Sequence, residues 1–351
     1  MNSNSLIVSK DCQKIDGYLR SCLYDLTRED YFLFSKTDNV LSLGEEYINF
    51  LREQGVVIEV PTKIKDQFKE IDFNFESYNQ INCCYTEYPH LKPFKLLTKM
   101  LCRNFAVRLQ SFKEHRIFLA ELFSWLEHSI INTIEVHITD NFIDSDDLNE
   151  IATSYSNSFS RFFVYSDNSH LFESFFETNK TSSILVNSFD RFRNPTSQHD
   201  NFFISIPVFS ESKDHNAYFN GKIYIDQQGI IKNAPETTST FGNIDRVENA
   251  KQLAEIVSVP EFQKYWKISK DKIDICRDCE FRRMCVSESV PKQRADGSWY
   301  AINECDYNPY IAKWKEEYGY VSLSDSGVSV DDENFKVDLP KLNSIIERIW
   351  G

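Results

Sequence analysis

The sequence predicts an α/β protein whose middle stretch forms a parallel sheet or part of a (β/α) barrel. Apolar residues make up 41% and aromatic residues 14% of the 351 residues, enough for the cores of two or three domains. In the middle stretch, strand-like and helix-like patterns alternate at intervals of about 25 to 30 residues, the spacing of βαβ units. The last third instead carries a cluster of cysteines. We therefore expect three domains, at residues 1–75, 76–215 and 216–351.

The first domain, residues 1–75, is expected to be a small α/β segment. Apolar runs predict strands at residues 18–26, 31–34 and 56–60. Residues 45–54 predict a helix, because Tyr47, Ile48 and Leu51 recur on one helical face and Gly55 follows as a stop signal.

The second domain, residues 76–215, alternates between the two patterns. Strands are expected at residues 105–109, 134–138, 162–165, 184–186 and 202–206, and helices at 116–130, from 145 onward, and at 171–178. The acidic run from Asp144 to Asp147 is interpreted as a helix start, since carboxylates suit the positive end of a helix, rather than as a magnesium site.

The third domain, residues 216–351, is predicted to open with a β-hairpin at 221–231 that turns at Gly229. A short helix is expected from Ser258, with Ser258 as its N-cap and Pro260 just inside it. After the cysteine cluster, residues 322–333 are rich in Ser and Asp and predict a loop. Residues 339–350 predict a final helix.

Charge and targeting signals limit the partners and the compartment. The net charge of −14 argues against nucleic acid and against an anionic membrane surface as partners. No run of about 18 apolar residues predicts a membrane span, and the first residues show no secretory signal. The expected location is the cytoplasm, where nine cysteines favour metal ligands or free thiols over disulfides.

Four of the nine cysteines fall close together, and they are the candidate metal ligands Cys276, Cys279, Cys285 and Cys305. Two cysteines separated by two residues can present both sulfurs to one side, and two more complete four-coordination. All-thiolate sets select zinc or an iron–sulfur cluster, and the spacing alone leaves both open.

The same segment resembles a known family. Residues 276–285, Cys-Arg-Asp-Cys-Glu-Phe-Arg-Arg-Met-Cys, resemble the signature of SPASM domains, and residues 305–310, Trp314 and the Gly-Asn turn at 242–243 are similar to further parts of that domain. The lead-in at 266–273 and the N-terminal residues 17–26 resemble the peptide maturases of grasp-with-spasm systems. A further SPASM cysteine soon after Cys285 is missing, so one centre is expected and not two.

The resemblance carries several implications. It implies biosynthesis of a ribosomally synthesised and post-translationally modified peptide (RiPP), with a precursor peptide and an ATP-grasp ligase as partners. It implies an iron–sulfur cofactor of the 4Fe-4S type, with zinc as the alternative. Residues 1–75 would then be leader-peptide-binding-like, residues 76–215 a degenerate barrel like that of radical SAM proteins, and residues 216–351 a SPASM-like metal-binding domain.

Radical SAM activity is nevertheless not expected. It requires three cysteines spaced C-x3-C-x2-C, and the cysteines before residue 276 lack this spacing: Cys12, Cys22, Cys83, Cys84 and Cys102. The chain also has no phosphate-binding loop, so ATP binding is assigned to a partner and no cofactor-binding residues are expected. Catalytic residues are unknown. The preferred hypothesis is an accessory protein that binds the precursor; the alternative is a redox or radical-type peptide-modifying enzyme.

Other patterns are weaker. His137, the dipeptides His199-Asp200 and Asp214-His215, and the vicinal pair Cys83-Cys84 are all interpreted as ordinary structural residues rather than as ligands or catalytic groups. Arg282 and Arg283 lie inside the cysteine cluster. Two interpretations stay open for them: compensation of thiolate charge, or simple surface charge.

Overall fold

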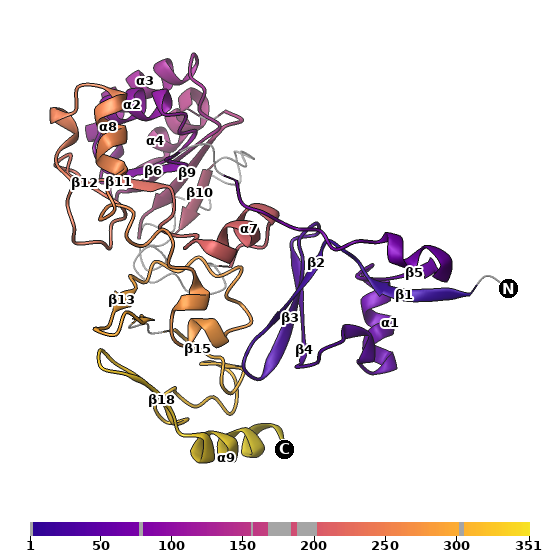
Figure 1. Ribbon diagram of the computed structural model, residues 1–351. Helices are drawn as coiled ribbons and strands as arrows, with labels where there is room; N and C mark the ends of the chain where they lie inside the picture. Colours follow the sequence, from indigo (N-terminus) through magenta and orange to yellow (C-terminus); the bar gives the residue numbers. More distant parts are fainter. Residues whose placement is uncertain (1–2, 77–79, 156, 168–183, 188–201, 302–304) are drawn as a thin grey trace. The chain divides into compact units, whose positions relative to one another are not determined.

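The computed structural model describes residues 3–76, 80–155, 157–167, 184–187, 202–301 and 305–351. The chain forms two compact units (Figure 1). Unit 1 contains Met1–Glu76, Gln198–Tyr218 and Trp266–Gly351, and unit 2 contains Ser77–Ser197 and Phe219–Tyr265. The predicted boundaries at residues 75 and 215 stay a prediction. The hairpin after residue 215 contributes strands to unit 2.

Unit 2 is built on a seven-stranded sheet in the order β10-β9-β8-β7-β6-β11-β12. The strands are β6 (Cys83–Thr86), β7 (Asn104–Leu109), β8 (Thr133–Thr139), β9 (Ser160–Tyr165), β10 (Ile184–Asn187), β11 (Lys222–Ile225) and β12 (Ile231–Lys232). Every neighbouring pair is parallel except β11 and β12, which form the predicted hairpin. The mixed α/β class and the parallel strands near residues 105, 134, 162 and 184 are confirmed.

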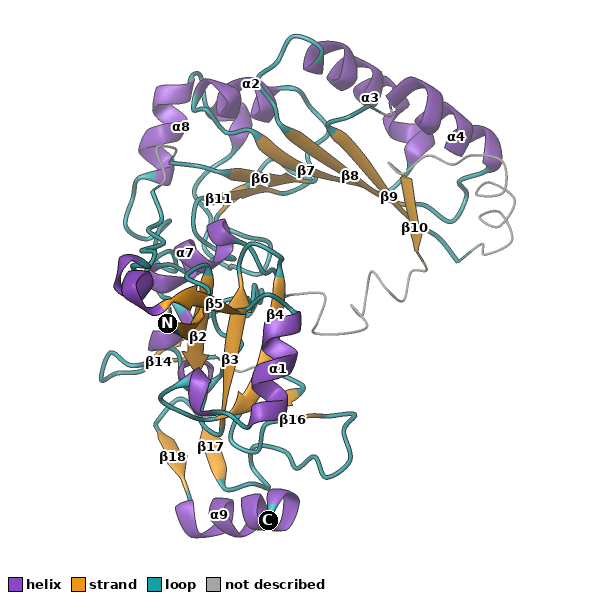
Figure 2. Cartoon of the chain, turned by 90° about the vertical axis from the view of Figure 1, so that its right-hand side faces the viewer, coloured by secondary structure: helices purple, strands orange, loops and turns teal. Residues whose placement is uncertain are grey.

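Helices cover one face of this sheet: α2 (Lys92–Lys99), α3 (Phe112–Leu126), α4 (Ser145–Glu150) and α8 (Ala250–Val257), with a π-helical turn at Ile151–Tyr155 (Figure 2). Alternation along β7 explains this, because Phe105, Val107 and Leu109 are buried while Ala106 and Arg108 are only half-buried. Phe94 of α2 stacks on Phe105 with ring centroids 5.0 Å apart. The apolar face of the sheet therefore packs under the helices.

Helix α3 begins about one turn earlier than predicted, since the Ser111 side chain accepts from the Glu114 backbone N–H at 3.5 Å and forms the N-cap. The expected start of α4 is confirmed in detail. Asp144 is the N-cap and forms a reciprocal capping box with Asp147. The helix predicted at 171–178 lies outside the described residues.

Two predicted elements are wrong. Residues 202–206 were expected to form a strand, but Phe202 makes only an isolated bridge to Cys285, and α7 (Ile206–Asp214) starts there with Ser205 as its N-cap. Ser258 was expected to start a helix, but it is the C-cap of α8. The apolar run at 202–206 predicted a strand, although Ser205 caps a helix that starts with Ile206. At Ser258 the serine was assigned to a helix start, whereas its hydroxyl donates to the Ala254 carbonyl at the end of α8.

The N-terminal part of unit 1 contains two small antiparallel sheets. β1 (Asn4–Val8) pairs with β5 (Val57–Pro61), and β2 (Cys12–Asp16), β3 (Arg20–Asp25) and β4 (Asp30–Ser35) form a three-stranded sheet. α1 (Glu45–Glu53) ends just before the predicted stop signal Gly55, whose φ of 72° favours glycine. Leu51 of α1 has no exposed surface and packs in a core with residues of both sheets.

The remainder of the described part of unit 1 contains α7, short 3-10 turns, short hairpins and a final helix. The hairpins are β13 (Lys292–Gln293) with β14 (Trp299–Tyr300), β15 (Tyr307–Asn308) with β16 (Lys313–Trp314), and β17 (Val328–Val330) with β18 (Phe335–Val337). The predicted loop at 322–333 thus contains β17. Helix α9 (Leu339–Trp350) is confirmed, and it buries Leu342 and Ile345 against Tyr310, Ile311 and Val328.

Within the described ranges, no helix combines the length and apolar character needed to cross a membrane.

Candidate metal centre

The four predicted ligands, Cys276, Cys279, Cys285 and Cys305, line one cavity of about 500 Å³ in unit 1. The first three are half-buried and Cys305 is exposed. Aromatic side chains that pack on one another form part of the same lining: Phe202, Phe281, Tyr307 and Trp314. The structure therefore brings together cysteines up to 29 residues apart, and it places Cys305 with the other three.

Local backbone geometry presents Cys276 and Cys279 together. They stand at the ends of a one-turn 3-10 helix, Cys276–Asp278, and the Cys279 N–H donates to the Cys276 carbonyl at 3.1 Å. In a 3-10 helix, side chains three residues apart lie on the same side. Ile275, just before this turn, has a φ of 67°, which a branched residue rarely adopts. The cysteine pair thus sits on a tight, strained turn.

A buried carboxylate lies directly behind Cys279. Glu280 has no exposed surface, and its Oε1 accepts from Arg20 Nε on β3 and from the Tyr307 hydroxyl. The Tyr24 hydroxyl donates to the Glu280 carbonyl at 2.7 Å. Arg20 also lies over the rings of Phe281 and Tyr307, each at 5.5 Å. The N-terminal sheet is therefore fastened to the cysteine loop.

Arg282 and Arg283, the cations within the cluster segment, form ion pairs and hydrogen bonds with groups other than the cysteine thiols. Both form ion pairs with Asp271, at 2.8 Å and 2.7 Å. Arg282 also donates to the carbonyls of Asp16 and Cys279, and Arg283 to the carbonyl of Ser212. Each side chain has only 14% of its surface exposed. The interpretation of both residues as simple surface charges is therefore wrong. Their contacts connect the cysteine loop to Asp16, Ser212 and Asp271.

Lys270 is a residue that the sequence interpretation missed. It lines the same cavity, half-buried, on the 3-10 turn η6 (Lys270–Lys272). Burial disfavours its charge, but nearby cysteine sulfurs more than compensate, and the net effect raises the pKa of Lys270. The only available signal was its position six residues before Cys276, within the lead-in that resembles the maturase family.

Burial shifts the pKa values of the paired cavity thiols, Cys276 and Cys279, upward. Burial raises the pKa of Cys276, with Lys270 opposing the shift, and burial raises the pKa of Cys279 well above its ordinary value. Metal ligation requires thiolates, so binding would release protons. Among the described residues, no three His, Cys, Asp or Glu side chains are grouped tightly enough to hold a metal ion. The cysteines share a cavity without forming a preassembled single-ion site.

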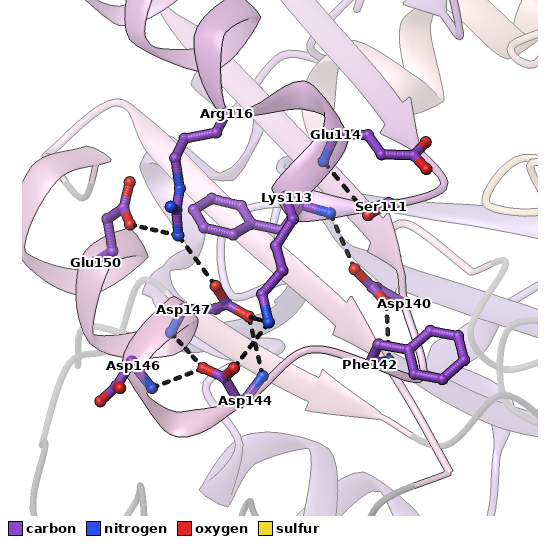
Figure 3. Close-up of polar contacts among 11 residues, drawn as sticks. Ser111, Lys113, Glu114, Arg116, Asp140, Phe142, Asp144, Asp146, Asp147 and Glu150 are labelled. Atoms are coloured by element: carbon purple, nitrogen blue, oxygen red, sulfur yellow. Dashed lines mark hydrogen bonds and ion pairs between the residues drawn. The ribbon is translucent and has the colours of Figure 1, made fainter.

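The acidic run at Asp144 serves structure, as the sequence indicated. Lys113 donates to Asp144 at 2.8 Å, and Arg116 pairs with Asp147 at 3.1 Å and with Glu150 at 2.8 Å. Figure 3 shows these two α3 cations pointing toward the carboxylates of the α4 segment. The same network holds the pKa of Asp144 below its ordinary value, chiefly through the Lys113 hydrogen bond and then the Asp147 N–H.

The described histidines and cysteines that were interpreted as ordinary structural residues pack against neighbouring side chains or lie outside the four-cysteine cavity. His137 stacks on Phe163 with centroids 4.6 Å apart, and its Nδ1 lies 3.2 Å from the Tyr165 hydroxyl. His215 packs against Phe75. Cys84, buried on β6, and its neighbour Cys83 belong to unit 2 and are absent from the lining of the four-cysteine cavity. His199-Asp200 lies outside the described residues.

The first strand of the parallel sheet in chain order is β6, and not the predicted strand at 105–109. The loop between β6 and α2, residues 87–91, contains no cysteine either. The missing C-x3-C-x2-C spacing is a property of the sequence and does not depend on which strand comes first.

Comparison with protein-family models, with curated proteins and with solved structures finds no match for this chain.

Proposed function

We propose that this chain is an accessory maturation protein of a grasp-with-spasm RiPP system, related to SPASM-domain peptide maturases. It binds a precursor peptide and presents it to an ATP-grasp ligase. The observation that carries the proposal is the single cavity lined by Cys276, Cys279, Cys285 and Cys305. This lining is what the SPASM resemblance requires of these four residues.

The donor set fits an iron–sulfur cluster. All four candidate ligands are thiols, which select zinc or iron–sulfur centres, and a cavity of about 500 Å³ has room for a polynuclear group. When bound, such a group supplies a covalent cross-link between the segment at 276–285 and Cys305, together with one-electron redox chemistry. The chain's own residues hold the site's shape: Glu280 and Arg20 fix the Cys279 turn from behind.

Strand edges in unit 1 support peptide binding. In the β1–β5 pair, Thr62 donates to the Ser3 carbonyl and Ser9 donates to the Val56 carbonyl. Antiparallel alternation then turns the N–H groups of Leu6 and Val8 away from β5. In the described part of the chain, neither group donates to another residue. An extended peptide can add there as a further strand.

On the edge strands of the three-stranded sheet, some backbone carbonyls already accept hydrogen bonds from side chains. On β4, the Leu33 carbonyl already accepts from the Tyr47 hydroxyl at 2.9 Å. On β2, the Asp16 carbonyl accepts from Arg282 at 2.8 Å. We therefore assign the precursor to the outer edge of β1.

Metal analysis tests the centre. The chain is purified under argon, and iron, acid-labile sulfide and zinc are measured for the wild type and for the four single Cys→Ser variants. Iron and sulfide in equal amounts, lost in every variant, support a four-cysteine cluster. Zinc alone supports the alternative, a zinc site held by the same cysteines, and a chain that binds neither metal overturns the proposal.

A second assay separates the accessory role from the alternative, a radical-type enzyme. The metal-loaded chain is incubated anaerobically with S-adenosylmethionine and dithionite, and 5′-deoxyadenosine is measured. The accessory role predicts none, because the C-x3-C-x2-C motif is absent. Stoichiometric or catalytic release would favour the enzyme. Co-purification of a tagged chain with the ATP-grasp protein tests the partner.

A further inference from the structure

Lys270 occupies a place in the four-cysteine cavity that its sequence neighbours do not share. Lys270 lines this cavity together with all four cysteines, Cys276, Cys279, Cys285 and Cys305. Within the described ranges, its side chain forms no ion pair with a carboxylate. Lys272, on the same short turn, is exposed and donates to the Lys267 carbonyl at 2.7 Å.

Four arginines around the loop form ion pairs with two carboxylates. Arg282 and Arg283 bind Asp271. Arg294 and Arg277 bind Asp274, the buried carboxylate that lines the cavity beside the cysteines. Each of these four arginines therefore has a carboxylate partner. Among the described residues, Lys270 is the lining cation that forms no ion pair with a carboxylate.

A lysine ammonium in this cavity would stabilise the negative charge of cysteine ligands. The metal-binding form of cysteine is the thiolate, so a centre with four cysteine ligands gathers negative charge in a partly desolvated cavity. Coulomb interactions are stronger there than in water. A nearby ammonium stabilises the more negative, reduced form of a redox centre more than the oxidised form, and it also favours the thiolates that hold zinc.

We propose that Lys270 is the charge-compensating residue of this centre, which raises the reduction potential of a bound cluster and strengthens thiolate ligation. This inference rests on the proposed function, since it requires a metal held by the four cysteines. It is separable from that function, because a centre can exist without depending on Lys270.

The test compares Lys270→Met and Lys270→Arg with Lys272→Met as the matched control, all purified anaerobically. Iron, sulfide and zinc are measured first. For an iron-containing chain, the midpoint potential is then measured by titration with dithionite, followed by electron paramagnetic resonance. For a zinc-containing chain, zinc affinity is measured by competition with a chelator.

In Lys270→Met, the reduction equilibrium should fall at least tenfold, which is a potential more negative by about 59 mV. With zinc, the affinity should fall at least tenfold. Lys270→Arg should stay close to the wild type, and so should Lys272→Met. Cluster loss in Lys270→Met with retention in Lys270→Arg also supports the inference.

An unchanged potential or affinity in Lys270→Met overturns the inference, as does an equal fall in Lys272→Met. Loss of metal from Lys270→Arg as well as Lys270→Met overturns it too, because charge is then not the property required. A wild type without metal is a different result: it refutes the proposed centre itself and the inference with it.

Discussion

Arg20 and Glu280, 260 residues apart in the sequence, form an ion pair in which the glutamate side chain has no exposed surface. Because Glu280 follows Cys279 directly, the pair joins β3 to the turn that carries the first two candidate ligands. A buried carboxylate of this kind depends on its cation. The N-terminal sheet and the cysteine loop should therefore lose order together.

Arg20→Ala tests this dependence. The substitution leaves Glu280 buried without its cation, and we expect a cost of about 3–5 kcal/mol. Hydrogen exchange measured by mass spectrometry should show faster exchange in β3 and in the segment from Cys279 to Cys285. Arg52→Ala is the control, since its pair with Glu59 is exposed on both sides and surface pairs contribute about 0–1 kcal/mol. Equal effects of the two substitutions would contradict the coupling.

The Asp144 cap predicts a pH dependence in unit 2. The pKa of Asp144 is lowered by the Lys113 hydrogen bond and by backbone N–H groups. A lowered folded pKa means that the stabilisation is present above the unfolded value of 3.8 and is lost as the pH falls below it. Exchange protection of α4 should thus decrease below about pH 4.

Two substitutions at this position separate the cap from the charge. Asp144→Asn keeps an N-cap acceptor and should remove most of the pH dependence. Asp144→Ala removes the cap and should destabilise α4 by about 1 kcal/mol near neutral pH. If α4 in Asp144→Asn still loses protection in acid to the same extent as the wild type, another group controls the transition.

The assignment of the precursor to β1 makes a backbone-specific prediction. Leu6→Pro removes an outward-facing N–H and leaves the hydrogen bonds between β1 and β5 in place, as proline is tolerated on the free side of an edge strand. Leu6→Ala keeps that N–H and removes only the side chain. With a fluorescent synthetic peptide of the precursor's leader sequence, anisotropy should show at least tenfold weaker binding for Leu6→Pro than for Leu6→Ala. Equal binding by both variants would place the peptide elsewhere.

How much of this was visible in the sequence depends on the range of the interactions. The parallel strands β7 to β10 and the helices α1, α3, α4 and α9 follow from local periodicity and caps, so the patterns predicted them. The short strands β1, β2 and β6 were missed, since four or five residues carry little periodicity. The Ser258 signal was assigned to the wrong end of a helix, because a hydroxyl can cap either end.

In the candidate site, too, local spacing was predictable and tertiary contacts were not. Spacing predicted Cys276, Cys279, Cys285 and Cys305, and the structure brings them to one cavity. Lys270 and the Arg20–Glu280 pair could not be predicted, as they depend on tertiary contacts with nothing periodic or spaced to mark them. Ile273, Phe281 and Met284 of the cluster segment lie in the core, although charged residues surround them in the sequence.

The last prediction concerns what the metal stabilises. Ordering a residue costs about 1–2 kcal/mol, and metal binding can supply on the order of 10 kcal/mol. Because Phe281 and Met284 are anchored in the core, loss of the metal should loosen chiefly the exposed part of the loop beyond Cys285. Cys279→Ser should therefore be cut faster by trypsin after Lys292, which is exposed.

Cys83→Ser is the matched control, since it replaces a half-buried cysteine of unit 2 and should leave cleavage after Lys292 unchanged. Peptide binding at β1 should persist in Cys279→Ser, because β1 packs in the separate core around Leu51. Binding and proteolysis are measured on the same preparation. Lost binding with a protected loop would mean that the centre acts on the peptide directly, and the structural role of the metal would be refuted.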